Sequence, residues 1–308
     1  MRGSVVAIVG SGFGLYGYMP ALIELYGCRI VLAERYRPTI EVRRELRQYL
    51  SSITWTTSVE HSVSCADGSI VAVAPSAQAK IVNQVLSSSR TKFLMLEKPI
   101  CPSPRQSQTL ITKITNERRL YRVGYTFLAA SWYEIVHETL SGSFDKIVIK
   151  WSFKANHFSC NKDTWKRYHS QGGGALRFYG IHLIAILSSW GYTQVENSRT
   201  ISRQFDEPES WFAMFKALGL PSCEVHVATN SRENKFEINA LGPGNTINPL
   251  IRMESPFSED EDSQGQDQRV PILGRLLDSF EKDSEPFEHL YRRINSLWHM
   301  TESLTVNY

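Results

Sequence analysis

A glycine-rich turn near the amino terminus has the composition of a phosphate-binding loop. Gly10, Gly12 and Gly14, with Phe13 between the last two, follow an apolar run and precede a stretch with helical spacing. The first glycine permits a tight turn, the second lets a pyrophosphate approach the backbone, and the helix start offers unpaired N–H groups. The third glycine of the usual G-x-G-x-x-G pattern would fall at Leu15. The pattern therefore predicts a dinucleotide site, with an ordinary glycine-rich turn as the alternative.

A carboxylate closes the next apolar run. Glu34 stands about twenty residues after Gly12, where such a side chain binds the 2′-hydroxyl of an adenine ribose. Because a carboxylate repels a 2′-phosphate, the sequence predicts NAD rather than NADP as the cofactor. Arg35 and Arg37 follow at once and could bind a phosphate, which leaves NADP as the alternative.

These residues require an alternation of strands and helices to position them. We predict strands at residues 5–9, 29–33, 70–74 and 92–96, and helices at residues 19–26, 39–51 and 77–86. This order is typical of a doubly wound parallel sheet. We expect this dinucleotide-binding domain to span residues 1–123.

The remaining residues, 124–308, have a different pattern and are expected to form a second domain for substrate binding and oligomerisation. Residues 146–153, 223–229 and 235–241 alternate polar and apolar side chains, which predicts a largely antiparallel sheet with one open face. Helices are expected at residues 175–190 and 287–304. An exposed apolar sheet face would favour aggregation of a monomer, so we expect it to form the interface of a homo-oligomer, a dimer or tetramer. The predicted fold class is α/β: a doubly wound parallel sheet followed by an α+β domain.

Charge and composition argue against several classes of partner. The chain has 34 basic and 31 acidic residues, and the basic ones are scattered, so a nucleic-acid partner is not expected. No apolar run reaches the roughly 18–20 residues of a membrane span. The acidic run at residues 259–262 lies in a Ser/Gln-rich stretch and is interpreted as a solvated loop rather than a metal site.

Cysteine usage and the first residues bear on the compartment. The five cysteines lie far apart without a Cys-x-x-Cys motif, which argues against disulfides and against a structural zinc ion. The first residues lack the pattern of a signal peptide. We therefore expect a cytoplasmic protein with no bound metal.

Three stretches together identify a resemblance. They are residues 6–22, with the glycine turn; Ala74-Pro75-Ser76 followed by Glu97-Lys98-Pro99; and residues 172–182, from a glycine triplet to His182. In this order and spacing they resemble the Gfo/Idh/MocA family of NAD(P)-dependent oxidoreductases. The resemblance implies an N-terminal Rossmann domain, and a C-terminal domain whose open sheet presents the substrate pocket and commonly mediates oligomerisation.

The resemblance also implies roles for particular residues. Lys98 and His182 would be catalytic: a lysine ammonium stabilises a developing alkoxide, and a histidine of ordinary pKa can accept the hydroxyl proton. The implied cofactor-binding residues are Gly10, Gly12, Phe13, Gly14, Glu34, Arg35, Pro75, Ser76, Glu97 and Lys98.

Two positions depart from the family pattern. Phe178 stands four residues before His182, where the family usually has an aspartate, and Gln78 stands where a histidine is common. Tyr168 or His169 could substitute for the missing aspartate. The residues expected on the substrate side are Trp165, Lys166, Tyr168, Phe178 and Tyr179.

The predicted function is hydride transfer between a nicotinamide and a sugar, nucleotide sugar or related polyol. Two alternatives stay open. One is a reductase of a non-sugar carbonyl or imine compound. The other is a catalytically inactive, nucleotide-binding regulatory protein, a possibility that Phe178 keeps open.

Overall fold

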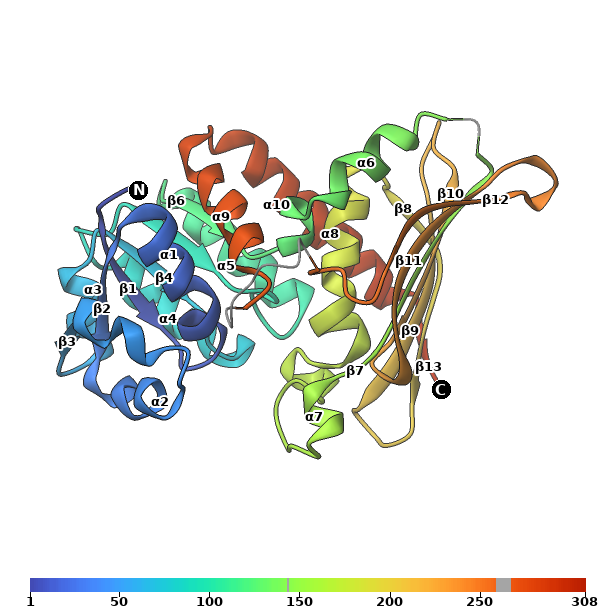
Figure 1. The fold of residues 1–308 in the computed structure, drawn as a ribbon. Coiled ribbons are helices and arrows are strands. Elements are labelled where there is room, and N and C mark those ends of the chain that lie inside the picture. The colour runs from blue at the N-terminus through green and yellow to red at the C-terminus, as the bar shows by residue number, and fades with distance from the viewer. Residues whose placement is uncertain (143, 259–266) are drawn as a thin grey trace. The chain divides into compact units, whose positions relative to one another are not determined.

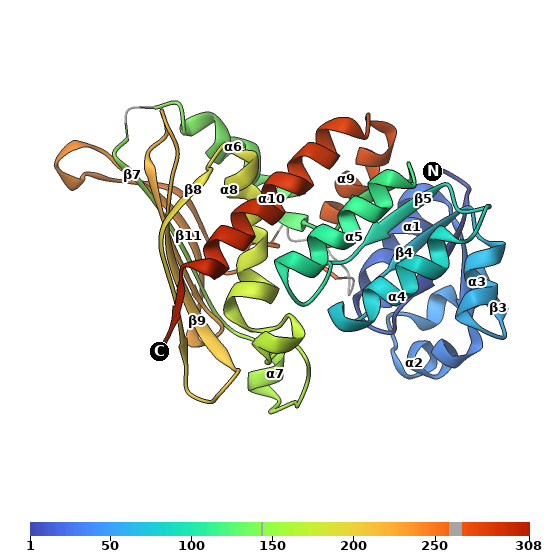
Figure 2. The same ribbon diagram turned by 180° about the vertical axis from the view of Figure 1, so that it is seen from behind.

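The computed structural model describes residues 1–142, 144–258 and 267–308. Contacts divide the chain into two units (Figures 1 and 2). Unit 1 comprises Met1–Cys101, Thr109–Ala129 and the described part of Glu259–Glu288. Unit 2 comprises Pro102–Gln108, Ala130–Ser258 and His289–Tyr308. The acidic run at residues 259–262 lies outside the described residues.

Unit 1 contains a parallel sheet with the strand order β3-β2-β1-β4-β5-β6. The strands are β1 (Val5–Val9), β2 (Arg29–Ala33), β3 (Ile53–Thr56), β4 (Gly68–Val71), β5 (Phe93–Leu96) and β6 (Leu120–Val123). The doubly wound sheet and its four predicted strands are confirmed, and β3 and β6 are additional. The strand order reverses between β1 and β4, which makes the carboxyl ends of these strands a topological switch point, where such sheets bind ligands.

The helices of unit 1 follow the prediction except in one segment. They are α1 (Met19–Tyr26), α2 (Arg37–Val42), α3 (Val59–Cys65), α4 (Pro75–Leu86), α9 (Val270–Asp278) and the later part of α5 (Pro104–Asn116). The predicted helix at residues 39–51 is wrong, because α2 ends at Val42 and a 3₁₀ helix follows at Arg47–Ser52. Ile40 and Leu46 are both buried. In one continuous helix they would lie about 120° apart around the axis, so burying both requires the break.

The returning segment after residue 266 packs on unit 1. The Tyr26 hydroxyl donates to the Gly274 carbonyl and to Asp278 Oδ1, both at 2.6 Å. Arg122, fully buried in β6, donates to the carbonyls of Ser279 and Lys282. The division at residues 123 and 124 stays a prediction, and by contacts these returning residues belong with unit 1.

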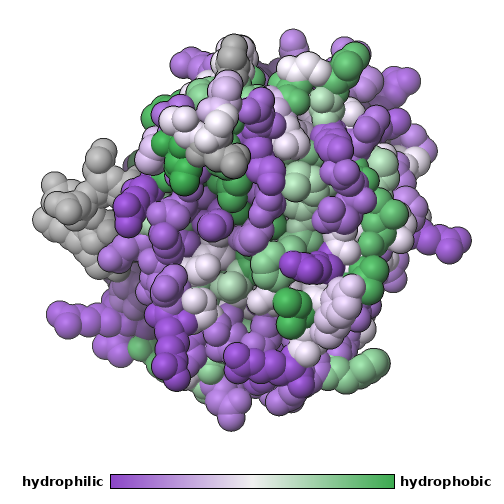
Figure 3. All heavy atoms as spheres, turned by 90° about the vertical axis from the view of Figure 1, so that its right-hand side faces the viewer, coloured by the Kyte–Doolittle hydropathy of each residue, from purple (hydrophilic) through white to green (hydrophobic). Residues whose placement is uncertain are grey.

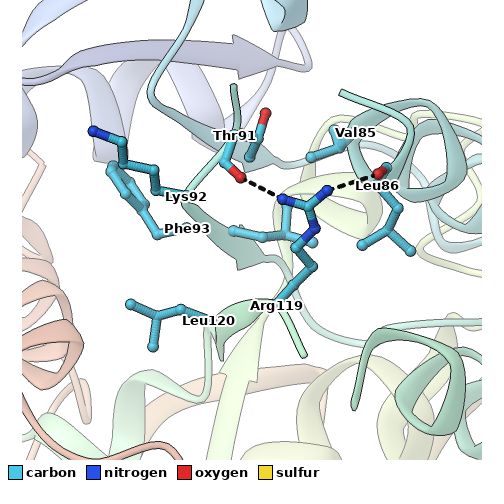
Figure 4. A pocket seen from close by; sticks show the side chains of 8 residues that line it. Val85, Leu86, Thr91, Lys92, Phe93, Arg119 and Leu120 are labelled. Carbon is cyan, nitrogen blue, oxygen red and sulfur yellow. Dashed lines mark hydrogen bonds between the residues drawn. The ribbon is translucent and has the colours of Figure 1, made fainter. Parts of the chain in front are cut away.

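A second arginine, Arg119, forms hydrogen bonds with backbone carbonyls near the amino ends of β5 and β6. Arg119 donates to the carbonyls of Leu86 and Thr91 (Figure 4). The hollow beside it has no room for a water molecule. This end of the sheet is therefore packed structure and holds no candidate site.

Unit 2 contains a seven-stranded sheet with the order β12-β11-β7-β10-β9-β8-β13. The strands are β7 (Lys146–Lys154), β8 (Gln194–Ser202), β9 (Pro208–Lys216), β10 (Ser222–Ala228), β11 (Asn230–Leu241), β12 (Ile247–Met253) and β13 (Thr305–Asn307). The β7–β10 and β8–β13 pairs are parallel and the other pairs are antiparallel. The largely antiparallel sheet containing all three predicted strands is confirmed.

Helices cover one face of this sheet. They include α6 (Trp132–Thr139), α7 (Asn156–Ser159), α8 (Ile181–Ser189) and the later part of α10 (Glu285–Ser303). Figures 1 and 2 show α8 and α10 against the same face. The helix predicted at residues 175–190 is a π-helix at Ala175–Gly180 that leads into α8. None of the described helices is both long and apolar enough to span a bilayer.

The other face of the sheet is open and chemically mixed. Figure 3 views it, and hydrophilic and hydrophobic residues are interspersed there. In β10 the buried Val225 and Val227 alternate with half-buried Glu224 and His226. Glu224 accepts hydrogen bonds from Lys146 at 2.7 Å and pairs with His226 at 2.6 Å. The open face therefore carries ion pairs as well as the expected apolar side chains.

Candidate functional site

The glycine turn has the geometry that a phosphate-binding loop needs. Gly10 has φ +132°, and a Cβ there would collide with the Ala72 carbonyl, so only glycine fits. A Cβ at Gly14 would lie 2.8 Å from Ile8 Cγ2, so this glycine allows close packing of helix on strand. Gly14 thus takes the packing role that the usual motif gives to its third glycine.

The space above Gly12 fits a pyrophosphate. A Cβ built on Gly12 would meet no atom within 4 Å. In the part of the chain that the structure describes, the Gly12 N–H has no hydrogen-bond acceptor. The turn leads into the helical segment from Gly14 through α1, whose amino end is electropositive. Open space, a free donor and a helix start are together what a dinucleotide pyrophosphate requires.

The residues after β2 form a compact cluster of opposite charges. Arg37 grips both oxygens of the Glu34 carboxylate, with Nε–Oε1 at 2.5 Å and Nη2–Oε2 at 3.2 Å. This hydrogen bonding lowers the pKa of Glu34. The Arg37 guanidinium also lies 4.2 Å from the centre of the Trp55 ring. The sequence suggested Glu34 as a ligand of the ribose 2′-hydroxyl and Arg37 as a ligand of a 2′-phosphate. In the structure these two side chains form an ion pair with each other.

Tyr36 links this cluster to the glycine turn. Its hydroxyl accepts a hydrogen bond from the Gly10 N–H at 3.1 Å and another from Arg35 at 2.9 Å. The ends of β1 and β2 are thereby fixed to each other through one side chain.

The Glu-Lys-Pro segment follows β5 at the same edge of the sheet. Glu97 and Lys98 are both buried, and the Lys98–Pro99 peptide is cis. The Tyr18 hydroxyl donates to Glu97 Oε1 at 2.7 Å. The Tyr18 ring in turn contacts Phe13, with centroids 5.3 Å apart. Since Pro75 and Ser76 begin α4 just after β4, unit 1 brings all of its predicted cofactor residues to the carboxyl ends of β1, β2, β4 and β5.

The side chain of Gln78 forms hydrogen bonds with the backbone of the Glu-Lys-Pro segment. Its side chain is fully buried in α4, and Nε2 donates to the carbonyl of Glu97 at 2.7 Å and to that of Ile100 at 2.9 Å. Gln78, which departs from the family pattern, therefore fixes the backbone immediately before Lys98 and immediately after Pro99. We call this pair of hydrogen bonds the Gln78 clamp.

In unit 2, His182 is the second residue of α8 and is buried. Its ring lies 6.5 Å from Trp151 and 6.0 Å from Phe257, both in edge-to-face geometry. Phe178 contacts Trp165 at 5.1 Å and Tyr179 at 4.7 Å, and Lys166 Nζ lies 5.2 Å from its ring centre.

The structure thus brings together four of the five residues predicted for the substrate side. Tyr168, the fifth, donates to Asp163 at 2.6 Å. His169, proposed as a substitute for the missing aspartate, lines a separate cavity of about 420 Å³ with the β8–β9 turn.

Sequence reasoning missed several residues beside these sites. Trp151 and Phe153 stand two apart at the end of a predicted strand, and their shared face was the available signal. His157 lies 6.3 Å from Tyr179, and burial together with nearby Lys166 and Arg167 lowers its pKa to about 4. No sequence signal indicated this histidine. Among the described residues, no group of three or more His, Cys, Asp or Glu side chains is placed to hold a metal ion.

Comparison with known proteins gives matches among solved structures. No family model and no curated protein sequence matches the chain. GenD2 from gentamicin A biosynthesis, solved with NAD, is 15% identical with a TM-score of 0.74, over 98% of this chain and 93% of that one. KijD10, a 3-ketoreductase from Actinomadura kijaniata solved with NADP, is 11% identical with a TM-score of 0.72, over 98% of each chain.

A regulatory protein has a similar fold. A super-repressor mutant of Gal80p from Saccharomyces cerevisiae is 13% identical with a TM-score of 0.71, over 97% of this chain and 95% of that one. The chain therefore has the fold shared by Gfo/Idh/MocA-type NAD(P)-dependent oxidoreductases and by Gal80p, as the sequence resemblance predicted.

Proposed function

We propose that this chain is an NAD(P)-dependent oxidoreductase of the Gfo/Idh/MocA family. The observation that carries the proposal is the open, donor-lined space above Gly12, at the same sheet edge as the clamped Lys98. The cofactor would be NAD in preference to NADP, supported by the carboxylate of Glu34 at the end of β2. The substrate class suggested by the fold is a sugar, nucleotide sugar or related polyol.

The chain's own residues would supply binding and proton transfer, while a bound nicotinamide would accept or donate the hydride. Gly12 and the helix start would hold the pyrophosphate. The Lys98 ammonium would stabilise negative charge on the substrate oxygen. In this proposal His182 acts on the same oxygen and takes up or returns its proton.

A second candidate is a reductase of a non-sugar carbonyl or imine compound. Phe178, ringed by Trp165 and Tyr179, occupies the position at which a carboxylate would orient a sugar hydroxyl. These aromatic side chains favour this candidate over a free polyol.

The test is a screen of the purified protein with both nicotinamide cofactors. Sugars, nucleotide sugars and polyols are offered with the oxidised cofactors, and carbonyl and imine compounds with the reduced ones, while absorbance of the reduced nicotinamide is followed. On an accepted substrate, His182→Ala should lower turnover by about 10²–10⁴-fold. Cofactor affinity, measured by fluorescence titration, should stay within about twofold.

His137→Ala is the matched control, because His137 is an exposed histidine on α6 whose side chain contacts Glu134 and the ring of Tyr133, both on the same helix. It should leave turnover unchanged. Failure to bind either dinucleotide would overturn the proposal. Dinucleotide binding without turnover on any compound would indicate the regulatory alternative instead.

A further inference from the structure

An arginine from the returning segment of unit 1 lies on the glycine turn. Arg269 immediately precedes α9, and its guanidinium carbon is 4.0 Å from the ring centre of Phe13. Phe13 stands between Gly12 and Gly14 in the turn. A guanidinium this close to an aromatic face is attracted by the quadrupole of the ring. The contact therefore joins the turn to a segment that lies far away in the sequence but in the same unit.

The position of Arg269 is itself fixed by a carboxylate. Asp267 Oδ1 accepts hydrogen bonds from Arg269 Nε at 2.7 Å and from the Arg269 backbone N–H at 3.0 Å. Asp267 Oδ2 accepts a third hydrogen bond from Nη2, at 2.7 Å. A bidentate pair of this kind fixes the plane of the guanidinium as well as its place. Since its charge is compensated, Arg269 can act on the turn by contact with the Phe13 ring and does not need to be a free cation.

The helix that follows Arg269 packs closely on α1 (Figure 1). A Cβ at Gly274 would lie 2.7 Å from Leu25 Cδ1, and the Gly274 carbonyl accepts the hydrogen bond from the Tyr26 hydroxyl. Close packing and a buried hydrogen bond leave α9 little freedom to slide on α1. Arg269, at the start of α9, therefore has a defined place relative to the turn.

The Phe13 ring is also in contact with its own neighbours in the chain. The Tyr18 ring meets it edge-to-face at 5.3 Å, and the Tyr16 ring is tilted against it at 5.5 Å. A Cβ at Gly17 would lie 2.2 Å from Phe13 Cε2, so the ring rests directly on that glycine. A side chain packed on several sides restricts the backbone that carries it. The contacts of the ring thus bear on the conformation of the turn at Gly12.

From these contacts we infer that Arg269 is a positioning residue of the dinucleotide site, which keeps the glycine turn in its phosphate-binding conformation through the Phe13 ring. The inference rests on the proposed function and deepens it by adding a distant residue to the cofactor site. When a binding conformation is populated only part of the time, the apparent affinity falls by that fraction. A cation–π contact changes such a population by up to about tenfold.

The test separates the pyrophosphate from the rest of the cofactor. Calorimetry compares adenosine with adenosine diphosphate, and the ratio of the two affinities is the diphosphate gain. Arg269→Met should lower this gain by about three- to tenfold and leave adenosine affinity within about twofold. Arg269→Lys, which keeps the cation, should recover part of the gain. Arg275→Met is the matched control, because Arg275 is an exposed arginine of the same helix that donates to the Ala129 carbonyl; it should change neither affinity.

A double-mutant cycle tests whether the effect passes through the Phe13 ring. Phe13→Leu removes the aromatic face, so adding Arg269→Met to it should lower the diphosphate gain no further. Because the cycle isolates the pair, other contacts of Arg269 do not affect its result. Thermal melts check that each variant is folded, and the milder Arg269→Lys carries the comparison if Arg269→Met does not fold.

Two results would overturn the inference alone. One is a diphosphate gain that is the same in the folded Arg269 variants as in the unmutated protein. The other is an additive loss in the double variant, which would show that Arg269 acts by another route. Failure of the unmutated protein to bind NADH or NADPH in the fluorescence titration would instead overturn the proposed function, and the inference with it.

Discussion

Replacing Gln78 tests whether one buried side chain fixes the backbone on both sides of Lys98. Gln78→Leu keeps the approximate volume but removes the Nε2 donor to the carbonyls of Glu97 and Ile100. Each buried carbonyl left without a partner costs about 1–3 kcal/mol. The same change removes the buried Gln78 Oε1, which has no hydrogen-bond partner among the described residues, and this offsets about 1–2 kcal/mol. With about 2 kcal/mol for each of the two carbonyls and about 1.5 kcal/mol offset, the expected net loss of stability is about 2–3 kcal/mol.

Scanning calorimetry should show this loss as a fall in Tm of about 4–12 °C. Gln84→Leu is the matched control: it lies on the same helix, and its amide donates to Glu60 in an exposed hydrogen bond. That substitution should cost less than about 0.5 kcal/mol. If the two variants melt within a degree of each other, the hydrogen bonds of Gln78 do not hold the segment, and the clamp interpretation is refuted.

Three further predictions concern the cofactor, acid stability and assembly. Glu34→Ala removes the carboxylate paired with Arg37 and should weaken NADH binding by about tenfold in a fluorescence titration. The variant should also discriminate less against NADPH. Tighter binding of NADPH than of NADH by the unmutated protein would contradict the predicted preference for NAD. Burial lowers the pKa of His157 to about 4, so as the pH falls below about 6.5 this histidine is protonated in the unfolded chain before it is protonated in the folded one. The free energy of unfolding should therefore drop by about 2 kcal/mol between pH 7 and pH 5. Urea unfolding of His157→Phe should lack this drop, and an identical pH dependence in the variant would contradict the prediction. Light scattering at micromolar concentration should show a dimer or tetramer, and a strict monomer would eliminate the open sheet face as a subunit interface.

Much of the parallel sheet was predictable because its central strands contain apolar runs: β1 is apolar throughout, and β4 ends in Ile70-Val71. Both strands are buried almost completely, and strands enclosed on both faces are rich in apolar residues. β6 was missed because its four residues include Arg122, and an arginine reads as a surface residue. Its burial depends on carbonyls near residue 280, which no local pattern indicates.

The candidate site was predictable where a motif is local and not where it depends on tertiary contacts. The glycine turn and Glu34 lie within one strand–helix–strand unit, so their spacing carried the information. The hydrogen bond from Tyr18 to Glu97 joins residues 79 apart in the chain. The ring contacts of Tyr179 likewise join β7 to the π-helix before α8; Tyr179 itself was predicted, whereas its partners Trp151 and Phe153 on β7 were missed.

The contacts of Arg122 and Tyr26 bear on how this protein is synthesised. Both side chains belong to the first half of the chain, yet their partners lie 157 and 248 residues further on. A nascent chain leaving the ribosome would present a parallel sheet with a buried guanidinium still unpaired, and burying such a charge without partners is costly. Unit 1 therefore cannot complete its folding before residues Ala130–Ser258 of unit 2 have been made, which departs from the usual order in which an N-terminal domain folds first. A stop codon shortly before residue 270 would thus damage both units, because unit 1 would lose α9 and unit 2 would lose His289–Tyr308.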